Sequence, residues 1–343
     1  MRKRTIKILS LILSLIIILT GCAKPAEQPA ASSSGDAKAE KPIELKMGIT
    51  SSETSSWYQG ALKFAELVKE RTNGKYDIKV YPNEQLSGGN QAKSIELLKA
   101  GAMDLSLHSN IIYSVMDEKF SVVSLPWLMP DNETVDEKIH GEGGEALKKL
   151  LLNNGIVGLG FGENGFRQLT NSKKEVRTPE DIKNMKIRIP GMKMYISLFT
   201  ALETDPITMN WSEVFTALQQ KTVDGHENPL DTIQSAKIHE IQDYLTIWNY
   251  SYDTIILGMN KAKFDSLDAE TQKIFQESAV EAMAYQVKLN RELEAKHLEN
   301  FKQIGMKITV LTPEEIAAFR EKVQSVYDEY EEKIGKELLD AFR

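Results

Sequence analysis

The folded part of the chain alternates between two hydrophobic periodicities. Residues 43–50 alternate apolar and polar side chains, as a half-buried strand does, whereas residues 56–69 place apolar side chains at helical spacing. The same patterns predict strands at 76–81, 104–108 and 156–161, and helices at 90–100 and 135–153. This succession of strands and helices is typical of an α/β fold with mainly parallel sheets.

A second set of elements begins near residue 165. The pattern predicts strands at 166–170 and 185–189 and helices at 193–202 and 212–220. Two strands rich in β-branched and aromatic residues follow close together at 244–250 and 254–260, and such a pair suits a connection between two lobes. About 300 residues in folded segments exceed the size at which one core usually keeps growing, so we expect two lobes.

The longest predicted helix covers residues 268–304, which contain neither Pro nor Gly. Its apolar residues recur at helical intervals up to Val287, whereas Asn290 stands where the stripe would continue. A helix of about 37 residues is roughly 55 Å long and could span two lobes. A strand at 307–311 follows, and Thr312-Pro313-Glu314-Glu315 predicts the start of a C-terminal helix with a capping box.

The first 21 residues have the layout of an export signal. Basic residues precede an apolar run from Ile8 to Leu19, which is too short to cross a bilayer as a permanent helix. The run ends in Leu19-Thr20-Gly21-Cys22, which resembles the lipobox of bacterial lipoproteins, so we expect Cys22 to be lipidated and to become the mature N-terminus. Cys22 is the only Cys of the sequence, so no disulfide within the chain competes for it. Residues 22–41, rich in Ala, Pro and Ser, are interpreted as a flexible tether.

Composition narrows the function further. The formal net charge is −7, and loss of the export signal would make it more negative, so nucleic acid is not an expected partner. The five His residues lack metal-ligand spacing, and we interpret the Glu294 and His297 pair as part of a solvated helix face. The sequence contains no nucleophile elbow, phosphate-binding Gly loop or dinucleotide fingerprint. It therefore indicates no cofactor, no metal and no enzyme.

Two segments carry a family resemblance. PEDIKNMKIRIP at 179–190 and ITMNWSEVFTALQQKTVDGHENPLD at 207–231 resemble the solute receptors of tripartite ATP-independent periplasmic (TRAP) transporters, the DctP family. YPNEQLSG, LKAGAMDLSL, LPWLM and the long late helix extend the resemblance over nearly all of residues 43–335. It implies a two-lobed fold like that of periplasmic binding proteins, with hinge strands and a long helix across both lobes. It also implies a monomer that binds an organic acid between the lobes and passes it to TRAP membrane subunits.

The resemblance assigns roles to four residues. Arg188 matches the family's carboxylate-binding Arg, and a guanidinium suits that role because its planar fork can donate two parallel hydrogen bonds. Arg167 matches a second Arg used by part of the family, Asn228 matches a cleft Asn, and Trp211 takes the place of a cleft aromatic residue. The residues alone would also fit a surface ion pair at Arg188, a capped loop at Asn228 and a core anchor at Trp211.

Two positions depart from the sialic-acid receptors of this family. Those receptors carry a Glu where this chain has Ser109 and an Asn where it has Thr50, so a sialic-acid ligand is disfavoured. His108 and Ser109 stand at the end of a predicted strand and are further candidates for the cleft lining. Asn110, Glu53, Trp57, Tyr58 and Gln85 also stand at the ends of predicted elements and are candidates on the same ground.

These inferences predict an arrangement and a location. We expect lobe I to comprise residues 42–164 and 254–293, and lobe II to comprise residues 165–253 and 294–343. We expect the protein outside the cytoplasm, held by lipid on Cys22 in the periplasm or on the outer face of the cytoplasmic membrane. One alternative is a surface lipoprotein that senses a ligand for a membrane signalling receptor. An exported hydrolase is a third possibility, but it would need a nucleophile or metal site that the sequence does not show.

Overall fold

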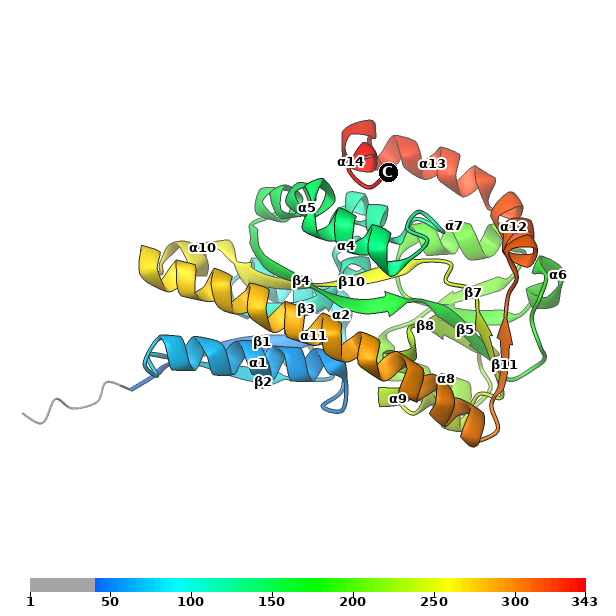
Figure 1. The fold of residues 1–343 in the computed structure, drawn as a ribbon, viewed down its shortest axis with the longest axis horizontal. Coiled ribbons are helices and arrows are strands. Elements are labelled where there is room, and N and C mark those ends of the chain that lie inside the picture. The colour runs from blue at the N-terminus through cyan, green and yellow to red at the C-terminus, as the bar shows by residue number, and fades with distance from the viewer. Residues whose placement is uncertain (1–40) are drawn as a thin grey trace, which may run out of the picture. The chain divides into compact units, whose positions relative to one another are not determined.

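The computed structural model describes residues 41–343, which form one compact unit. The expected signal peptide, the lipidated Cys22 and nearly all of the tether lie outside the described residues. Within residues 41–343, none of the helices combines the length and the apolar character that crossing a membrane requires. Figure 1 shows strands and helices interleaved along the chain, which confirms the predicted α/β class.

The first sheet, sheet A, has five strands in the order β2-β1-β3-β10-β4. Strand β1 pairs in parallel with β2 and β3, whereas β10 pairs in antiparallel fashion with β3 and β4. The strand bounds are β1 Ile43–Ile49, β2 Tyr76–Tyr81, β3 Leu105–Ser109, β4 Ile156–Phe166 and β10 Tyr252–Asn260.

The second sheet, sheet B, has six strands in the order β11-β9-β5-β8-β6-β7. Its outer pairs are parallel, and the two pairs that involve β5 with β8 and with β9 are antiparallel. The expectation of mainly parallel sheets therefore holds only for part of each sheet. The strand bounds are β5 Gln168–Asn171, β6 Lys186–Ile189, β7 Asp205–Thr208, β8 Gly225–Asn228, β9 Tyr244–Ile247 and β11 Lys307–Val310.

The antiparallel pairs arise where the chain passes from one sheet to the other. Strand β4 of sheet A continues through Arg167 directly into β5 of sheet B, and β9 of sheet B leads back into β10 of sheet A. The predicted strand at 166–170 is thus divided, because β4 extends to Phe166. The chain crosses between sheets twice through nearly continuous strands, as expected for 244–260. The placement of the lobe boundaries at residues 164 and 254 stays a prediction.

The long helix α11, Ala269–Gln303, confirms the predicted helix. It packs on α1 and β4 near sheet A and on α9, and Figure 1 shows it running from beside α10 to beside β11. Strand β4 approaches it closely because Gly160 and Gly162 lack side chains: a Cβ on Gly162 would lie 2.6 Å from Gln286 Oε1. The predicted stripe needs correction, since Val280 is 65% exposed, while polar Gln286 and Asn290 are buried.

The single helix predicted at 135–153 is two helices in the structure, α4 Asn132–His140 and α5 Glu142–Asn153. Gly141 separates them in a non-helical conformation, and a Cβ there would lie 2.5 Å from the Glu137 carbonyl oxygen. The predicted capping box at Thr312 is confirmed at the start of α12. The remaining helices are α1 Ser56–Arg71, α2 Gln91–Lys99, α3 Asn110–Tyr113, α6 Pro179–Ile182, α7 Lys193–Ala201, α8 Trp211–Gln219, α9 Leu230–Ser235, α10 Lys261–Asp265, α12 Pro313–Lys322, α13 Gln324–Ile334 and α14 Lys336–Asp340.

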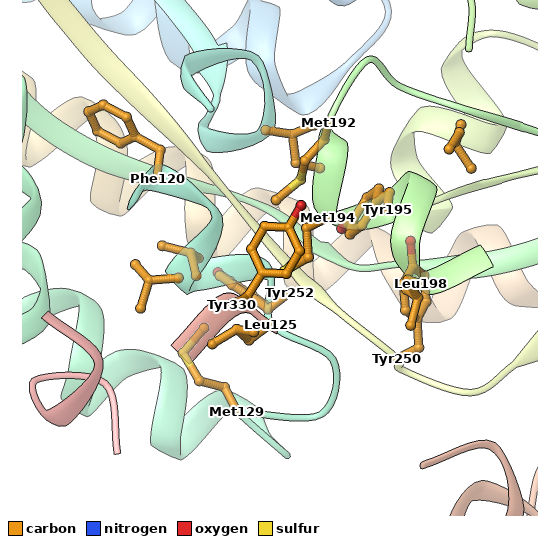
Figure 2. Close-up of a cluster of buried hydrophobic side chains, with 14 of the residues drawn as sticks. Phe120, Leu125, Met129, Met192, Met194, Tyr195, Leu198, Tyr250, Tyr252 and Tyr330 are labelled. Carbon is orange, nitrogen blue, oxygen red and sulfur yellow. The ribbon is translucent and has the colours of Figure 1, made fainter. Parts of the chain in front are cut away.

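An apolar cluster joins segments that are far apart in the sequence. Figure 2 shows Phe120 and Leu125, which lie just after α3, in one group with Tyr195 of α7 and Tyr330 of α13. Helix α13 packs on α7 and on the short 3₁₀ helix at Glu118–Ser124. The C-terminal helices therefore complete a core that elements next to both sheets share.

Candidate functional site

A cavity lies where strands of the two sheets end. The empty space inside it, together with the space in its open mouth, is about 410 Å³. Ligand sites in α/β proteins commonly occur at such strand ends. Residues at the ends of sheet A strands, at the ends of sheet B strands and on the five helices α1, α2, α3, α8 and α9 line it. They include Thr50, Ser109, Asp253, Arg188, Asn228, Trp57, Gln91 and Trp211. The structure thus brings together segments separated by up to about 200 residues of sequence.

Arg188 lines the cavity from β6 and is only 2% exposed. Its Nε and Nη2 donate to the Met209 carbonyl oxygen at 3.2 and 2.7 Å, and its guanidinium lies 5.6 Å from the Trp211 ring centre. Among the described residues, no carboxylate lies within salt-bridge distance of it. Burial and, more weakly, the charge of Arg167 lower the pKa of Arg188 to about 9, against the opposing effect of Glu227. The side chain therefore stays charged at neutral pH without a counter-ion in the protein.

Arg167, between β4 and β5, also lines the cavity, but its charge is compensated. Its Nε and Nη2 contact both carboxylate oxygens of Glu227, and its Nη1 lies 2.6 Å from Asp253 Oδ2. Burial disfavours the charge of Arg167, yet Glu227 and Asp253 raise its pKa well above the usual value. Arg167 thus ties β8 and β10 together at the crossing between the sheets.

Asn228 ends β8 and is positioned by Arg167. Its Oδ1 accepts a hydrogen bond from Arg167 Nη2 at 3.0 Å, which defines the orientation of the amide. Its Nδ2 is buried and has no hydrogen-bond partner in the described part of the chain. Because an unpaired buried donor is costly, this amide is suited to donate to a bound molecule.

Trp211 reaches the cavity from helix α8, whereas Ser109 reaches it from the end of β3 in sheet A. Trp211 begins α8, its backbone N–H donates to Gln91 Oε1 at 3.2 Å, and its ring stacks on His226 at 6.1 Å. Burial and the charges of Arg188 and Arg167 lower the pKa of His226 well below its usual value, so this imidazole is neutral. Ser109 ends β3 and donates its hydroxyl proton to Asp253.

His108 is the one of the six main candidates that the structure does not bring to the cavity lining. Of the further candidates, Trp57 lines the cavity, whereas Asn110, Glu53, Tyr58 and Gln85 do not. It is fully buried, and its Nε2 lies 3.0 Å from Glu84 Oε1. Neighbouring side chains of a strand point to opposite faces, so His108 and Ser109 of β3 cannot both face the same space. Burial opposes ionisation of Glu84, but His108 and nearby hydroxyl groups lower the pKa of this carboxyl to about 2.

Sequence reasoning missed two acidic residues, Asp253 and Glu227. Asp253 lines the cavity and accepts hydrogen bonds from Arg167, from Ser109 and from Asn164 Nδ2 at 2.7 Å. Burial raises the pKa of Asp253, while the Arg167 charge and the donated hydrogen bonds favour its ionised form. An acid inside the otherwise apolar strand Tyr252–Asn260 was the available signal, because a buried carboxylate needs a partner.

The interpretation of Glu294 and His297 as a solvated face is wrong. His297 is largely buried, and its Nε2 lies 3.2 Å from Asp231 Oδ1. Burial and the neighbouring charge of Glu163 raise the pKa of Glu294 to about 7. Residues 41–343 contain no group of three or more His, Cys, Asp or Glu side chains placed to hold a metal ion.

Comparison with known proteins gives consistent matches. The model of the family described as bacterial extracellular solute-binding protein, family 7, matches residues 47–333. The chain is 33% identical over 264 residues to the 2,3-diketo-L-gulonate-binding periplasmic protein of Escherichia coli (strain K12), which covers 77% of this chain and 80% of the relative. It is also 33% identical to the C4-dicarboxylate-binding periplasmic protein of Shewanella loihica, over 88% of this chain and 89% of the relative.

A solved structure extends the match to the fold. The TRAP periplasmic solute-binding protein of Ralstonia eutropha H16 with bound (S)-2-acetolactate superimposes with a TM-score of 0.85 and is 36% identical. The match covers 87% of this chain and 97% of that one. The agreement in fold therefore extends over most of the chain.

Proposed function

The chain belongs to the bacterial extracellular solute-binding proteins of family 7, and from this premise we propose how its cavity works. It is an extracytoplasmic solute receptor of the TRAP type, which binds an organic acid and delivers it to a membrane transporter. In our proposal the acid occupies the cavity between the two sheets, with its carboxylate on Arg188 and an oxygen on Asn228 Nδ2. Trp211 packs beside the bound carboxylate.

The observation that carries this proposal is the uncompensated charge of Arg188. A guanidinium buried without a carboxylate partner is unfavourable, because the protein interior replaces little of its lost hydration. A ligand carboxylate would supply the missing charge and accept two N–H bonds in the same step. Arg167 supports the proposal by contrast, since it already has two acidic partners and needs none from a ligand.

We propose that ligand binding stabilises a closed arrangement, in which elements next to sheet A and elements next to sheet B both contact the ligand. Trp211 N–H donates to Gln91 Oε1 and Ser212 Oγ donates to the Gly89 carbonyl oxygen at 3.2 Å, so α8 meets the start of α2 at the edge of the cavity. A ligand that touches Arg188 on one side and Ser109 on the other adds contacts that exist only in this closed arrangement. Such differential contacts shift the equilibrium toward closure.

The family consists of binding proteins, and we propose that this chain likewise performs no catalysis. The alternative of a ligand sensor for a signalling receptor is not favoured, because the matched relatives are solute-binding proteins of transporters. Lipid on Cys22 and a monomeric state are further parts of the proposal. Replacement of Cys22 by Ser is expected to release the protein from the membrane fraction into the soluble fraction, and retention would contradict the anchor.

The test of the binding site is calorimetric titration with organic acids. (S)-2-Acetolactate, 2,3-diketo-L-gulonate and succinate are suitable first probes, and at least one acid is expected to bind the wild-type protein. Arg188→Met is expected to weaken that binding at least about 100-fold, since truncating one side of a buried charged contact costs several kcal/mol. Arg177→Met is the matched control, because Arg177 is half-exposed and pairs with Glu175 and Glu315 far from the cavity. Equal affinity in Arg188→Met and wild type would show that the carboxylate binds elsewhere.

A further inference from the structure

We infer, resting on the proposed function, that the ligand is a hydroxylated monocarboxylate and that the cavity selects against dicarboxylates. Matched relatives bind acids of both kinds, so the family alone does not decide between them. The distribution of charges and of hydroxyl protons around this cavity does.

The lining offers only one uncompensated cation. Of the cavity-lining residues, Arg167 and Arg188 are the two with a permanent positive charge. Arg167 is paired with Glu227 and Asp253, whereas no carboxylate in the described residues pairs with Arg188. One ligand carboxylate therefore finds a partner on Arg188. A second carboxylate would lose its hydration without gaining a counter-charge.

Asp253 makes a second carboxylate still less favourable. It is the one acidic residue of the lining, it is fully buried, and it accepts hydrogen bonds from Arg167, Ser109 and Asn164. Three donated bonds stabilise its ionised form, so the wall carries a negative charge next to Ser109. Like charges at close range in a poorly hydrated space repel strongly.

Three of the four hydroxyl groups of the lining present acceptors and not donors; the fourth, that of Ser51, makes no hydrogen bond within the described residues and can donate or accept. Thr50 Oγ1 donates to Glu84 Oε1 at 2.6 Å, Ser109 Oγ donates to Asp253, and Thr232 Oγ1 donates to Asn164 Oδ1 at 2.9 Å. A hydroxyl has one proton, so all three offer only lone pairs to a ligand.

The N–H groups of the same wall are committed in a similar way. Trp57 Nε1 donates to Asn164 Oδ1 at 3.1 Å, and Asn164 Nδ2 donates to Asp253. Hydroxyl groups of a ligand can donate hydrogen bonds to these lone pairs. An ionised carboxylate has no proton to donate, so its oxygens would be repelled by them. The wall therefore suits the O–H donors of a hydroxy acid.

Two sets of probes isolate the terminal group of the ligand. D-Erythronate, meso-tartrate and butanoate share four carbons. The first two both carry hydroxyls at C2 and C3 and differ at C4, which is a CH2OH group in D-erythronate and a carboxylate in meso-tartrate, whereas butanoate carries neither hydroxyls nor a second carboxylate. Galactonate, galactarate and hexanoate form the same series with six carbons. We expect the hydroxylated monocarboxylate of a series to bind at least about 100-fold more tightly than its dicarboxylate, and more tightly than the unsubstituted acid. Isothermal titration calorimetry at constant ionic strength measures all six constants on the wild-type protein.

A variant tests the assigned cause. Asp253→Asn removes the negative charge of the wall and should reduce the preference for the monocarboxylate over the dicarboxylate at least about tenfold. Asp265→Asn is the matched control, because it removes one negative charge from an exposed side chain of α10 outside the cavity lining, and should leave the preference unchanged within about threefold. The wild-type series decides the inference even where the Asp253→Asn protein fails to fold.

The outcomes separate this inference from the function beneath it. Tighter binding of meso-tartrate or galactarate than of its monocarboxylate partner would overturn the inference and leave the receptor function standing. An unsubstituted acid that binds as well as its hydroxylated partner would overturn the part that concerns hydroxyl donors. Failure of all six acids and of the acids named above to bind a folded protein would overturn the proposed function and this inference together.

Discussion

Replacement of Arg188 by Met is expected to stabilise the protein in the absence of ligand while abolishing stabilisation by ligand. The two guanidinium groups of the cavity, those of Arg188 and Arg167, differ in whether their charge is paired with a carboxylate. Arg188 is buried without a carboxylate partner, so its charge opposes folding. Met has a similar length and no charge, and it can occupy the same space beside Trp211.

The magnitude follows from the shifted pKa. A pKa of about 9 in place of 12.5 corresponds to a cost of roughly 5 kcal/mol at neutral pH, at 1.36 kcal/mol per tenfold change. The substitution also removes the hydrogen bonds to the Met209 carbonyl oxygen, worth about 2–3 kcal/mol, and the contact with the Trp211 ring, worth about 1 kcal/mol. The difference is a gain of about 1–2 kcal/mol, equivalent to a rise in Tm of roughly 2–6 °C for a protein of this size.

The pH dependence has a definite sign. A basic group whose pKa is lowered on folding binds fewer protons in the native state, so its penalty is complete below about pH 9 and is lost as the pH rises above that value. At pH 7 the wild-type protein carries the full penalty and Arg188→Met carries none. Urea unfolding at pH 7, monitored by circular dichroism with and without the best ligand of the panel, measures both effects.

Arg167→Met is the control, and its effect should have the opposite sign. Removal of Arg167 leaves Glu227 and Asp253 buried without their cation, which should cost about 3–5 kcal/mol. The reasoning is refuted if Arg188→Met is destabilised as strongly as Arg167→Met. That result would mean that the Arg188 charge is already neutralised in the ligand-free protein.

Three further predictions concern the scaffold. Gln286→Ala should lower the free energy of unfolding by about 3 kcal/mol, because the Glu163 backbone N–H and carbonyl lose buried partners at 2.8 Å; a loss below 1 kcal/mol in urea titration would contradict this. Thr312→Ala should cost about 1 kcal/mol in the same assay by removing the capping box of α12, and an unchanged midpoint would argue against it. Glu294, whose pKa of about 7 exceeds the ordinary 4.5, binds protons preferentially in the native state, so stability falls as the pH rises from about 4.5 to 7. Glu294→Gln should therefore exceed wild type by about 3 kcal/mol at pH 8 and match it near pH 4, and parallel pH profiles of the two proteins would refute the assignment.

Much of the fold could be predicted because strand and helix periodicities are local. The helix from Ala269 to Gln303 and the capping box at Thr312 depend on residues within a few positions of each other. The break at Gly141 also has a local cause, because glycine is a poor helix former and the close contact at this position is with Glu137. The extension of β4 to Phe166 depends instead on its pairing with the distant strand β10. Glycines on β4 permit the close approach of α11, and no local pattern contains that information.

Prediction of the site from the sequence was limited in the same way, because it also depends on contacts between distant residues. Arg188 was identified through the family resemblance, and its isolation from carboxylates could be seen only in three dimensions. Arg167 matched the same family pattern, yet its acidic partners Glu227 and Asp253 come from positions 60 and 86 residues away. The sequence therefore could not show which of the two Arg side chains lacks an acidic partner, because those partners are distant in the sequence.

One side of the cavity is held by more buried hydrogen bonds than the other, and this difference predicts which side opens. On one side, Asp231 of α9 accepts a hydrogen bond from the Ser56 backbone N–H at 3.0 Å. The Ser56 hydroxyl lies 3.0 Å from both Asp231 Oδ2 and Asn290 Oδ1 of α11 and can donate its one proton to either of them. That buried joint connects α1, α9 and α11 beside Trp57 and Thr232 of the lining.

The opposite edge of the cavity is held by fewer hydrogen bonds. There, α8 and the start of α2 are joined by hydrogen bonds from Trp211 and Ser212 alone, and Ser212 is exposed. Since buried networks open at greater cost than a few partly exposed bonds, ligand exchange should proceed at the α8 edge. Arg188 of the neighbouring β6 would then regain water as that edge opens, which lowers the cost of its charge in the open state and leaves the ligand carboxylate to favour closure.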